Sequence, residues 1–483
     1  MTRDLTVGKP LRNIVIFTIP ILIGNIFQQL YSMVDAIIVG QTINNDALAG
    51  VGATSAISFL VIGFVQGLTA GFAVKTSQLF GAGDEEGVRR SIASSLLLSV
   101  VLTVILTAVS VVTTMPLLDL MNTPDDIIDY SYDYIVTIYW GLGATVFYNL
   151  GSSVLRAIGD SRTPLVFLVL AAVLNVGLDF LFIVYFRMGV AGAGWATVLS
   201  QAISAIGCFV FLFARFRSYR IGKKHFANPF KFYWQHMAIG LPMALQFSIT
   251  SIGMMVQQSA LNKLGTAAVT AYTAASKIDN LATQSLYALG STVATYCGQN
   301  YGAGKFANIR VGVRWSMIIG VVCALLGLGF VTIGAEPMTR LFSSDVTDEM
   351  MDMSKQYLLW QGVFYIALAA IFVYRDALQG IGRSALTMIG GGIELVGRVI
   401  ASLVFAAQFG FVGICASNPT AWVCVDVFLI ISYIVILHRI FAKRRALGLG
   451  EGEKMPLSAV YAQSPVPSNA SSSDPASDAE KTR

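Results

Sequence analysis

The stretch IASSLLLSVVLTVILTAVSVVTT, residues 92–114, contains no charged side chain and is long enough to cross a lipid bilayer as a helix. Within the hydrocarbon of a membrane, only a helix or a closed barrel satisfies its own backbone hydrogen bonds. The run is too long for a barrel strand and lacks the alternation of apolar and polar residues that such a strand shows. It therefore predicts a membrane-spanning helix.

The composition extends this interpretation to the whole chain, which is 55% apolar and only 12% charged, against about 25% charged in soluble domains. Twelve runs of spanning length can be drawn, so we predict an all-α polytopic membrane protein. The predicted spans are residues 14–39, 48–74, 92–114, 132–155, 164–186, 190–214, 237–262, 268–296, 312–334, 357–378, 386–408 and 412–437.

The positions of the cations predict the orientation of the chain. Most Lys and Arg residues fall in loops on the side of the N-terminus, whereas the opposite loops carry only Arg187, Lys263, Arg340 and Lys355. Since cations accumulate in short cytoplasmic loops, both termini are expected in the cytoplasm. The net charge of +5 is too small and dispersed for nucleic-acid binding, and we see no cleavable signal peptide at residues 1–12.

Comparison of the chain with itself reveals an internal repeat displaced by about 221 residues. The matched features are Pro20 with Pro242, the GAG loops at 81–83 and 302–304, Pro116 with Pro337, LRAIG at 155–159 with LQGIG at 378–382, and Gly189 and Gly192 with Gly410 and Gly413. Each half holds six spans, so both halves enter the membrane from the same side.

We therefore predict two pseudo-symmetric six-helix lobes around a central cleft, residues 1–218 and 219–447, followed by a disordered cytoplasmic tail at 448–483. The tail is rich in Ser, Pro, Ala and Asp and cannot bury a core. Two lobes that rock against each other suit a transporter with alternating access. Duplication for folding alone is the other interpretation.

Motifs for enzymatic or ATP-driven chemistry are absent from the sequence. No stretch has the spacing of a phosphate-binding loop, and the five cysteines show no paired spacing. The three histidines lie in predicted loops or at span ends. We expect no catalytic residue, no cofactor and no enzyme activity, so that transport would be driven by an ion gradient.

Ionisable side chains within spans are functional candidates because they are costly at bilayer depth. Asp35 ends a helical stripe that begins at Asn25, and Asn175 and Asp179 lie one turn apart on another span. Two carboxyls with neighbouring amide and hydroxyl oxygens suit H+ or Na+. Burial and mutual repulsion would favour proton uptake unless a cation neutralises the two acids. A hydrogen-bonded core pair without transport function is the alternative.

Further polar residues in the predicted lobes would supply a supporting or substrate-facing network. These are Gln28, Asn149, Thr197, Gln201, Gln246, Gln257, Glu394 and Arg398. Glu394 and Arg398 are one turn apart and can neutralise each other, which favours a structural or substrate-facing pair over an ion site.

Other charged residues in or near the spans have no clear role from sequence. We assign none to Lys277, Asp279 or Asp426, and we interpret Arg375 and Asp376 as a surface pair at a helix end.

Several of these segments together resemble the multidrug and toxic-compound extrusion (MATE) family, in its DinF-like bacterial branch. They are LYSMVDAIIVGQ at 30–41, the two GAG loops, LRAIGDSRTP at 155–164 and NVGLDFLF at 175–182. The resemblance covers roughly residues 10–440. It implies a cation-coupled antiporter that exports organic, often cationic and amphipathic, compounds through a V-shaped pair of lobes.

The resemblance also implies site residues. The family's cation or proton site falls on Asp35, Asn175, Asp179 and Thr197, with Gln28 and Asn149 around it, and no metal other than Na+ is expected there. An acidic site in the second lobe of another branch is not matched. The chain would bind small molecules and membrane lipids, act as a monomer and reside in the bacterial cytoplasmic (inner) membrane.

Two other functions stay open from the sequence. A flippase for a lipid-linked sugar would use the same duplicated bundle and an arginine-rich lateral cleft. A membrane-embedded transferase would need clustered acids at a loop edge. Asp125, Asp126 and Asp129 have the spacing for the latter, although they suit the start of a helix better.

Overall fold

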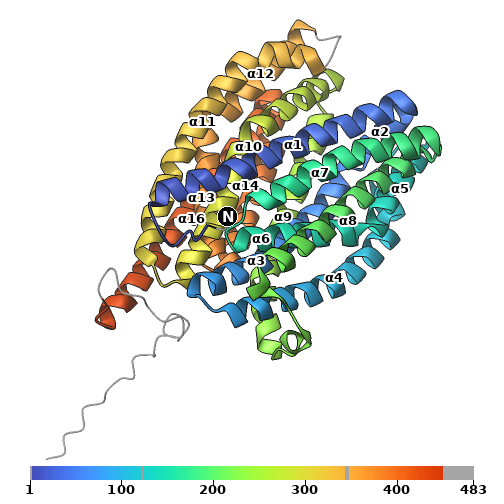
Figure 1. Cartoon of the computed structure of the whole chain (residues 1–483). Coiled ribbons are helices and arrows are strands. Elements are labelled where there is room, and N and C mark those ends of the chain that lie inside the picture. The colour runs from blue at the N-terminus through green and yellow to red at the C-terminus, as the bar shows by residue number, and fades with distance from the viewer. Residues whose placement is uncertain (1–2, 122, 343–346, 450–483) are drawn as a thin grey trace, which may run out of the picture.

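The computed structural model describes residues 3–121, 123–342 and 347–449, and these ranges are mainly helical with no β-strand (Figure 1). The predicted tail lies outside the described residues from position 450 onward. The α-helices are α1 (Pro10–Thr42), α2 (Asn45–Ala53), α3 (Ser55–Ala82), α4 (Glu85–Leu120), α5 (Asp125–Trp140), α6 (Leu142–Ala157), α7 (Arg162–Asp179), α8 (Gly189–Arg215), α9 (Phe230–Asn262), α10 (Thr266–Gly302), α11 (Phe306–Phe342), α12 (Asp348–Val363), α13 (Tyr365–Gly380), α14 (Ser384–Ile400), α15 (Ala406–Phe409) and α16 (Phe411–Ala446). The π-helices η1 (Phe180–Tyr185) and η4 (Ala401–Phe405) and the 3-10 helices η2 (Arg217–Tyr219) and η3 (Lys223–Phe226) complete the order.

Every predicted span coincides with a helix or a broken helix in the described part of the chain. Nine helices there are long and apolar enough to cross a membrane, and the pair α12 and α13, bent by 46°, makes a tenth. The span predicted at 132–155 is broken at Gly141 into α5 and α6. The one remaining predicted span is α10. It is less apolar than the others, and its Ala, Thr, Asn and Gln side chains are largely buried among other helices.

The backbone confirms the internal repeat. Three pairs of matched glycines adopt a positive φ: Gly83 and Gly304 at +75° and +68°, Gly159 and Gly382 at +90° and +80°, and Gly189 and Gly410 at +61° and +57°. Residues with a side chain rarely adopt this conformation, which accounts for glycine at the same turns of both halves. The helices α7 and α14 also each run into a π-helix.

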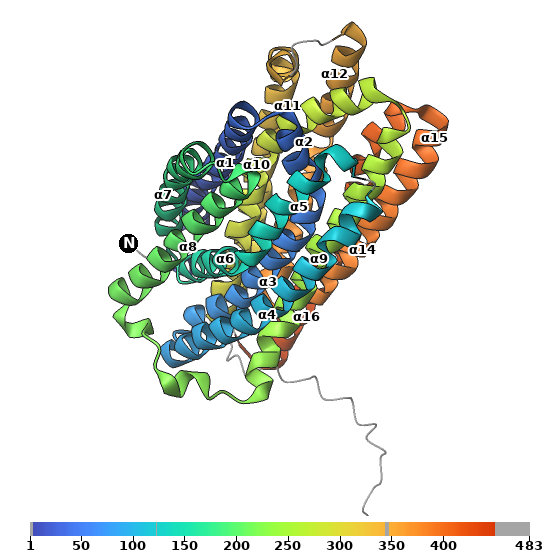
Figure 2. The same cartoon turned by 90° about the vertical axis from the view of Figure 1, so that its right-hand side faces the viewer.

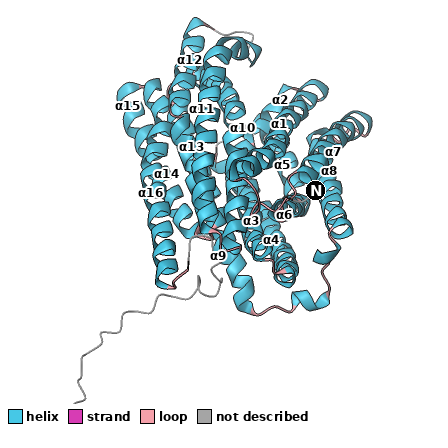
Figure 3. Cartoon of the chain, turned by 60° about the vertical axis from the view of Figure 1, so that its left-hand side comes forward, coloured by secondary structure: helices cyan, strands magenta, loops and turns pink. Residues whose placement is uncertain are grey.

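The two halves form two lobes that meet at one end of the molecule. In the first lobe α8 packs on α6 and α7, and in the second α10 packs on α11, α12 and α13. Across the interface α3 crosses α9 so closely that a Cβ on Gly67 would lie 2.6 Å from the Met243 carbonyl oxygen. The helices of the two lobes spread apart toward the end that carries α2 and α15 (Figures 2 and 3). The predicted two-lobe fold is confirmed.

The N-terminal segment joins both lobes at the end where they meet. The Arg3 N–H donates to the Gly159 carbonyl oxygen in the first lobe at 2.9 Å. The Leu5 N–H donates to Oε1 of Gln299 in the second lobe at 2.9 Å, and Nε2 of Gln299 donates to the Ala157 carbonyl oxygen at 2.9 Å. These hydrogen bonds tie the two lobes together at this end.

Helix α1 contacts both lobes along its length. Its first half packs with the second lobe, where Phe17 belongs to the same buried cluster as Val293 of α10. Farther along, Gly24 lies against Leu168 of α7, and Val39 packs with Ile183 of η1. A change in the position of α1 therefore alters its contacts with both lobes.

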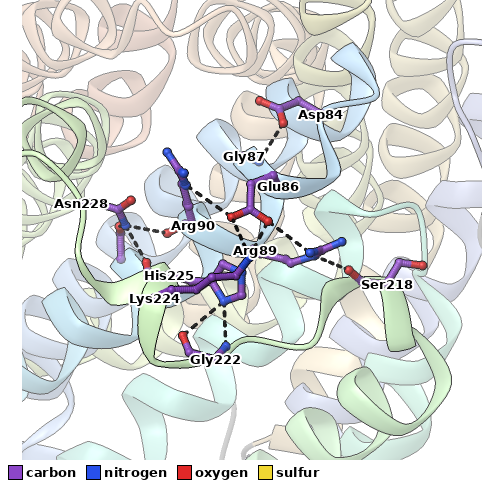
Figure 4. A network of polar contacts seen from close by, with 11 residues as sticks. Asp84, Glu86, Gly87, Arg89, Arg90, Ser218, Gly222, Lys224, His225 and Asn228 are labelled. Atoms are coloured by element: carbon purple, nitrogen blue, oxygen red, sulfur yellow. Dashed lines mark hydrogen bonds and ion pairs between the residues drawn. The ribbon is translucent and has the colours of Figure 1, made fainter.

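The connection between the lobes is held against the start of α4 (Figure 4). The Glu86 carboxylate lies 3.4 Å from Nε2 of His225, and Nε of Arg89 donates to the Ser218 carbonyl oxygen at 2.6 Å. Asn228 donates to Oγ of Ser94 at 3.0 Å. The predicted domain boundary between residues 218 and 219 falls in this connection and stays a prediction.

Replacing Gly67 with Ala should destabilise the protein, because the new Cβ would press on the backbone of α9, which has little room to move. Overpacking of this kind costs about 1–3 kcal/mol. We expect a lower melting temperature of the purified protein. The matched control is Gly329→Ala in α11, where nothing lies within 4 Å of the new Cβ. Equal melting temperatures for the two variants would contradict the close crossing of α3 and α9.

Candidate functional site

Two buried carboxyl groups face each other inside the first lobe. Asp35 of α1 is 7% exposed and Asp179, the last residue of α7, is fully buried. Their carboxyl groups lie within hydrogen-bonding range of each other. Two carboxyl groups can share a hydrogen bond only when one of them carries a proton, so this arrangement links the geometry of α1 and α7 to protonation.

The amide of Asn175 connects Asp179 to α8. Asn175 is fully buried one turn before Asp179. In the orientation that satisfies its surroundings, its amide nitrogen donates to Oδ2 of Asp179 at 3.0 Å and its oxygen accepts from the Thr197 N–H at 3.3 Å. The four residues Asp35, Asn175, Asp179 and Thr197 predicted from sequence are therefore brought together from three helices.

One oxygen on each acid, Oδ1 of Asp35 and Oδ1 of Asp179, is buried and has no hydrogen-bond partner within the described residues. A buried acceptor without a partner is costly, and the cost is larger if the group is charged. Binding of a proton or a small cation relieves it. The oxygen-rich donor set fits H+ or Na+, which prefers oxygen ligands, and no cluster of three or more His, Cys, Asp or Glu occurs in the described ranges.

The sequence prediction missed two tyrosines beside the acids. The hydroxyl of Tyr31 lies 3.2 Å from Oγ1 of Thr197, and Tyr134 of α5 is within electrostatic reach of both carboxyls. Tyr31 precedes Asp35 by one turn, so helical spacing from Asp35 could have found it. Tyr134 comes from a distant segment and carries no comparable signal.

The other polar residues predicted in the first lobe form no hydrogen bond with the two acids within the described residues. Gln28 and Asn149 line the central cavity described below. Gln201 accepts from Oγ1 of Thr145 at 2.6 Å, and Asn149 donates to the Thr145 carbonyl oxygen at 2.8 Å. Ser32, which shares the helical stripe from Asn25 to Asp35, is exposed and donates to the Gln28 carbonyl oxygen of its own helix.

A cavity of about 280 Å³ lies between the lobes, lined by α1, α3, α6 and α7 on one side and α9, α10 and α13 on the other. Its wall combines aromatic rings with polar groups. The lining includes Asn25, Gln28, Tyr148, Asn149, Arg156, Phe247, Tyr287, Phe372, Arg375, Asp376 and Gln379. A pocket with mainly apolar walls and a few polar groups is typical of sites for organic molecules.

The interpretation of Arg375 and Asp376 as a surface pair is wrong. Nε of Arg375 lies 3.7 Å from Oδ1 of Asp376, but the aspartate is buried and both residues line the cavity. The sequence placed them at a helix end, and it could not reveal that this end abuts the interface between the lobes. Arg156 likewise lines the cavity, where it donates to the hydroxyls of Ser152 and Ser153.

The second lobe contains a buried ion pair in place of facing acids. Nη2 of Arg398 donates to Oε1 of Glu394 at 2.7 Å, and Nε donates to Oδ1 of Asn418 at 3.1 Å. Neither charged residue lines the central cavity. This geometry favours the structural interpretation of the pair over a substrate-facing one.

The other two residues predicted in the second lobe are Gln246 and Gln257, and the sequence assigned no role to Asp279. Gln246 accepts from Nε2 of Gln379, a cavity residue, at 2.9 Å. Gln257 is buried, and its amide nitrogen has no hydrogen-bond partner within the described residues. Asp279 accepts from the Tyr365 hydroxyl at 2.6 Å.

Comparison with models of known protein families shows which family the chain belongs to. The model of the MatE family matches it twice, over residues 20–181 and 242–404. The chain belongs to the MatE family. The two matches start at Pro20 and Pro242, and they cover the two halves of the repeat.

Individual MatE relatives agree with this assignment. The chain is 32% identical to the probable multidrug resistance protein YpnP of Bacillus subtilis, over 80% of the chain and 85% of that protein. It is 26% identical to the probable multidrug resistance protein YoeA of the same organism, over 65% of the chain and 70% of that protein. An outward-facing structure of a multidrug resistance MATE transporter superposes with a TM-score of 0.81 at 24% identity, covering 92% of this chain and 99% of that one. The last comparison shows the same fold.

Breaking the ion pair of the second lobe should destabilise the protein. Removing one partner of a buried pair leaves an uncompensated charge, at a cost of about 3–5 kcal/mol. We expect Arg398→Met and Glu394→Gln each to lower the melting temperature, and the double variant to lose less than the sum of the two. Transport per folded molecule should be retained in the double variant. A stable double variant without transport would instead mean that the pair contacts the substrate.

Proposed function

We propose that this MatE protein is a cation-coupled antiporter that exports organic, amphipathic compounds from the cell by alternating access. The proposal is carried by one observation: two buried, facing carboxyls with unpartnered oxygens lie in the same lobe that forms one wall of the central cavity. Relatives named as probable multidrug resistance proteins support efflux as the direction of transport. The lobes and the cavity occur in one chain, which supports a monomer.

The coupling ion binds at Asp35 and Asp179. Carboxyls within hydrogen-bonding range of each other favour a shared proton, because the shared bond requires one. Na+ is the alternative ion, since Asn175 and Thr197 could add oxygens to those of the two acids. In either case the ion moves the equilibrium only if it binds one conformation of the transporter more tightly than the other.

Helix α1 carries the signal from the ion to the substrate. Asp35 lies toward its C-terminal end, while Pro20, Asn25 and Gln28, nearer its N-terminus, line the cavity. Proline inside a helix removes one backbone hydrogen bond and permits a kink. Protonation at Asp35 changes how α1 packs on α7, and the resulting shift of α1 changes the cavity wall.

The conformation described above is the outward-facing state of the proposed cycle. The lobes meet at the end that the cation distribution assigns to the cytoplasm, and they spread apart at the other end (Figure 3). The hydrogen bonds of Arg3, Leu5 and Gln299 belong to the cytoplasmic closure. They must break for the inward-facing state to form.

The two rival functions find less support. A flippase would use an arginine-rich cleft. The central cavity is lined by two arginines, of which Arg375 lies beside Asp376 and Arg156 donates to serine hydroxyls. Arg398 is neutralised by Glu394 and lies outside the cavity lining. A transferase would need acids gathered at a site. Asp125 and Asp126 instead form the exposed first turn of α5, where negative charge favours the helix N-terminus.

Replacing Asp35 with Asn should reduce export to background while the protein stays folded, because the amide cannot take up a proton or neutralise a cation. The measurement is dye uptake into inverted membrane vesicles, which corresponds to export from the cell, with a proton gradient and a sodium gradient imposed separately. Asp119→Asn, which removes an exposed carboxylate at the end of α4, is the matched control. Full export by the Asp35 variant would refute the coupling role, and the gradient that drives the native protein identifies the ion.

A disulfide between the lobes should stop the transport cycle. A Cβ on Gly63 of α3 would lie 3.5 Å from the Cβ of Phe247 on α9, close to the separation found in disulfides, which is about 3.5–4.5 Å. We expect the variant with Gly63→Cys and Phe247→Cys to lose export on oxidation and to regain it on reduction. Each single variant, treated in the same way, controls for the native cysteines. Export that persists in the cross-linked protein would show that the two lobes need not separate here.

A further inference from the structure

A second cavity, of about 890 Å³, lies in the second lobe and shares no lining residue with the central one. It is formed by the start of α11, the end of α13 and the last turns of α16. Its polar wall consists of Arg310, Arg314, Tyr374, Tyr433, His438, Arg444 and Arg445. We name it the basic pocket.

Three arginines of the basic pocket, Arg310, Arg314 and Arg445, form no ion pair with an acid of the described residues. No Asp or Glu of the described ranges lines the pocket. The carboxyl group of Asp426 lies on α16 two turns deeper than Tyr433, where it is buried. The pocket therefore holds excess positive charge that attracts an anion.

Tyr433 supplies an independent sign of a ligand. Its side chain is only 6% exposed and lines the pocket, yet its hydroxyl has no hydrogen-bond partner within the described residues. A buried hydroxyl without a partner is costly, and native proteins seldom leave one in this state. An oxygen-rich group between Tyr433 and the two arginines of α11 would satisfy it.

The remaining wall of the pocket is apolar and continues onto the outer surface of the lobe. Arg310, Arg314 and Ile318 follow one another at single-turn spacing on α11, so the pocket changes from charged to apolar as it enters the membrane. Ile318 and Ile434 are exposed, as is the neighbouring Val435. The pocket is charged at the membrane surface and apolar below it, as is an anionic lipid with its head group and acyl chains.

We propose that the basic pocket binds an anionic phospholipid. Its phosphate lies between Arg310, Arg314 and the Tyr433 hydroxyl, and its acyl chains follow Ile318 and Ile434. Basic pockets between membrane helices on the cytoplasmic side are known to bind such head groups. Inorganic phosphate offers the same charge, but it would leave the apolar wall without a partner.

The test uses the purified full-length protein and native mass spectrometry, which counts bound lipids. Dioleoyl-phosphatidylglycerol is compared with dioleoyl-phosphatidylcholine, which has the same chains and no net charge. We expect the native protein to retain one phosphatidylglycerol about tenfold more strongly, since each basic residue near an anionic group adds measurably to binding. The double variant Arg310→Gln and Arg314→Gln should lose this preference.

Two further variants serve as a control and as a second test of the pocket. Arg439→Gln removes an exposed cation of α16 that does not line the pocket, and it should retain the preference. Tyr433→Phe removes only the hydroxyl and should weaken phosphatidylglycerol several-fold, even if the double variant fails to fold. Equal retention of both lipids, or equal losses in Arg439→Gln, would overturn the proposal. Displacement of the lipid by millimolar inorganic phosphate would also overturn it, in favour of a free-phosphate site.

Discussion

The burial of two facing carboxyls in a membrane-embedded lobe is the constraint on which the rest of the arrangement depends. An ionised side chain at bilayer depth costs several kcal/mol unless it is paired or hydrogen-bonded. Asn175 compensates Asp179 in part, but one oxygen on each acid keeps no partner in the described part of the protein. The packing of α1 against α7 is therefore most stable when a proton or cation is present. That dependence is what a coupled transporter requires, because ion binding must favour one packing over another.

The position of α1 allows a change at the two acids to affect the cavity between the lobes. Its first half shares a buried core with α10 of the second lobe, and its second half carries Asp35 into the first lobe. A helix anchored in both lobes cannot adjust to a change at one end without altering its contacts at the other, since protein interiors are close-packed. The cavity between the lobes is bordered by the middle of the same helix, at Pro20 and Asn25. In the proposed mechanism, the ion site and the substrate cavity thus share helix α1.

Much of this could be predicted from the sequence, because lipid imposes simple rules. Apolar runs of spanning length located all twelve spans, and the paired glycines located the repeat. The four candidate ion-site residues lie together in the first lobe, and their role as an ion site stays a prediction; Tyr31 and Tyr134 were missed. The failures have a common cause. Asp376 is buried because the end of α13 meets the interface between the lobes, and α5 and α6 break at Gly141, where a Cβ would lie 2.1 Å from Val198 of α8. Hydropathy distinguishes residues that face lipid from residues that face water. It carries no information on which residues are buried between the lobes.

The two halves share a backbone plan but handle buried charge in different ways. In the second lobe, Glu394 and Arg398 neutralise each other at 2.7 Å, so the local charge stays balanced whatever ions are present. In the first lobe, Asp35 and Asp179 have no basic partner among the described residues, so their charge depends on ion uptake. A pair that balances itself keeps its packing through the cycle, whereas an unbalanced pair changes with the ion. In the proposed mechanism, the first lobe therefore carries two facing acids that respond to an ion gradient, whereas Glu394 and Arg398 of the second lobe balance each other.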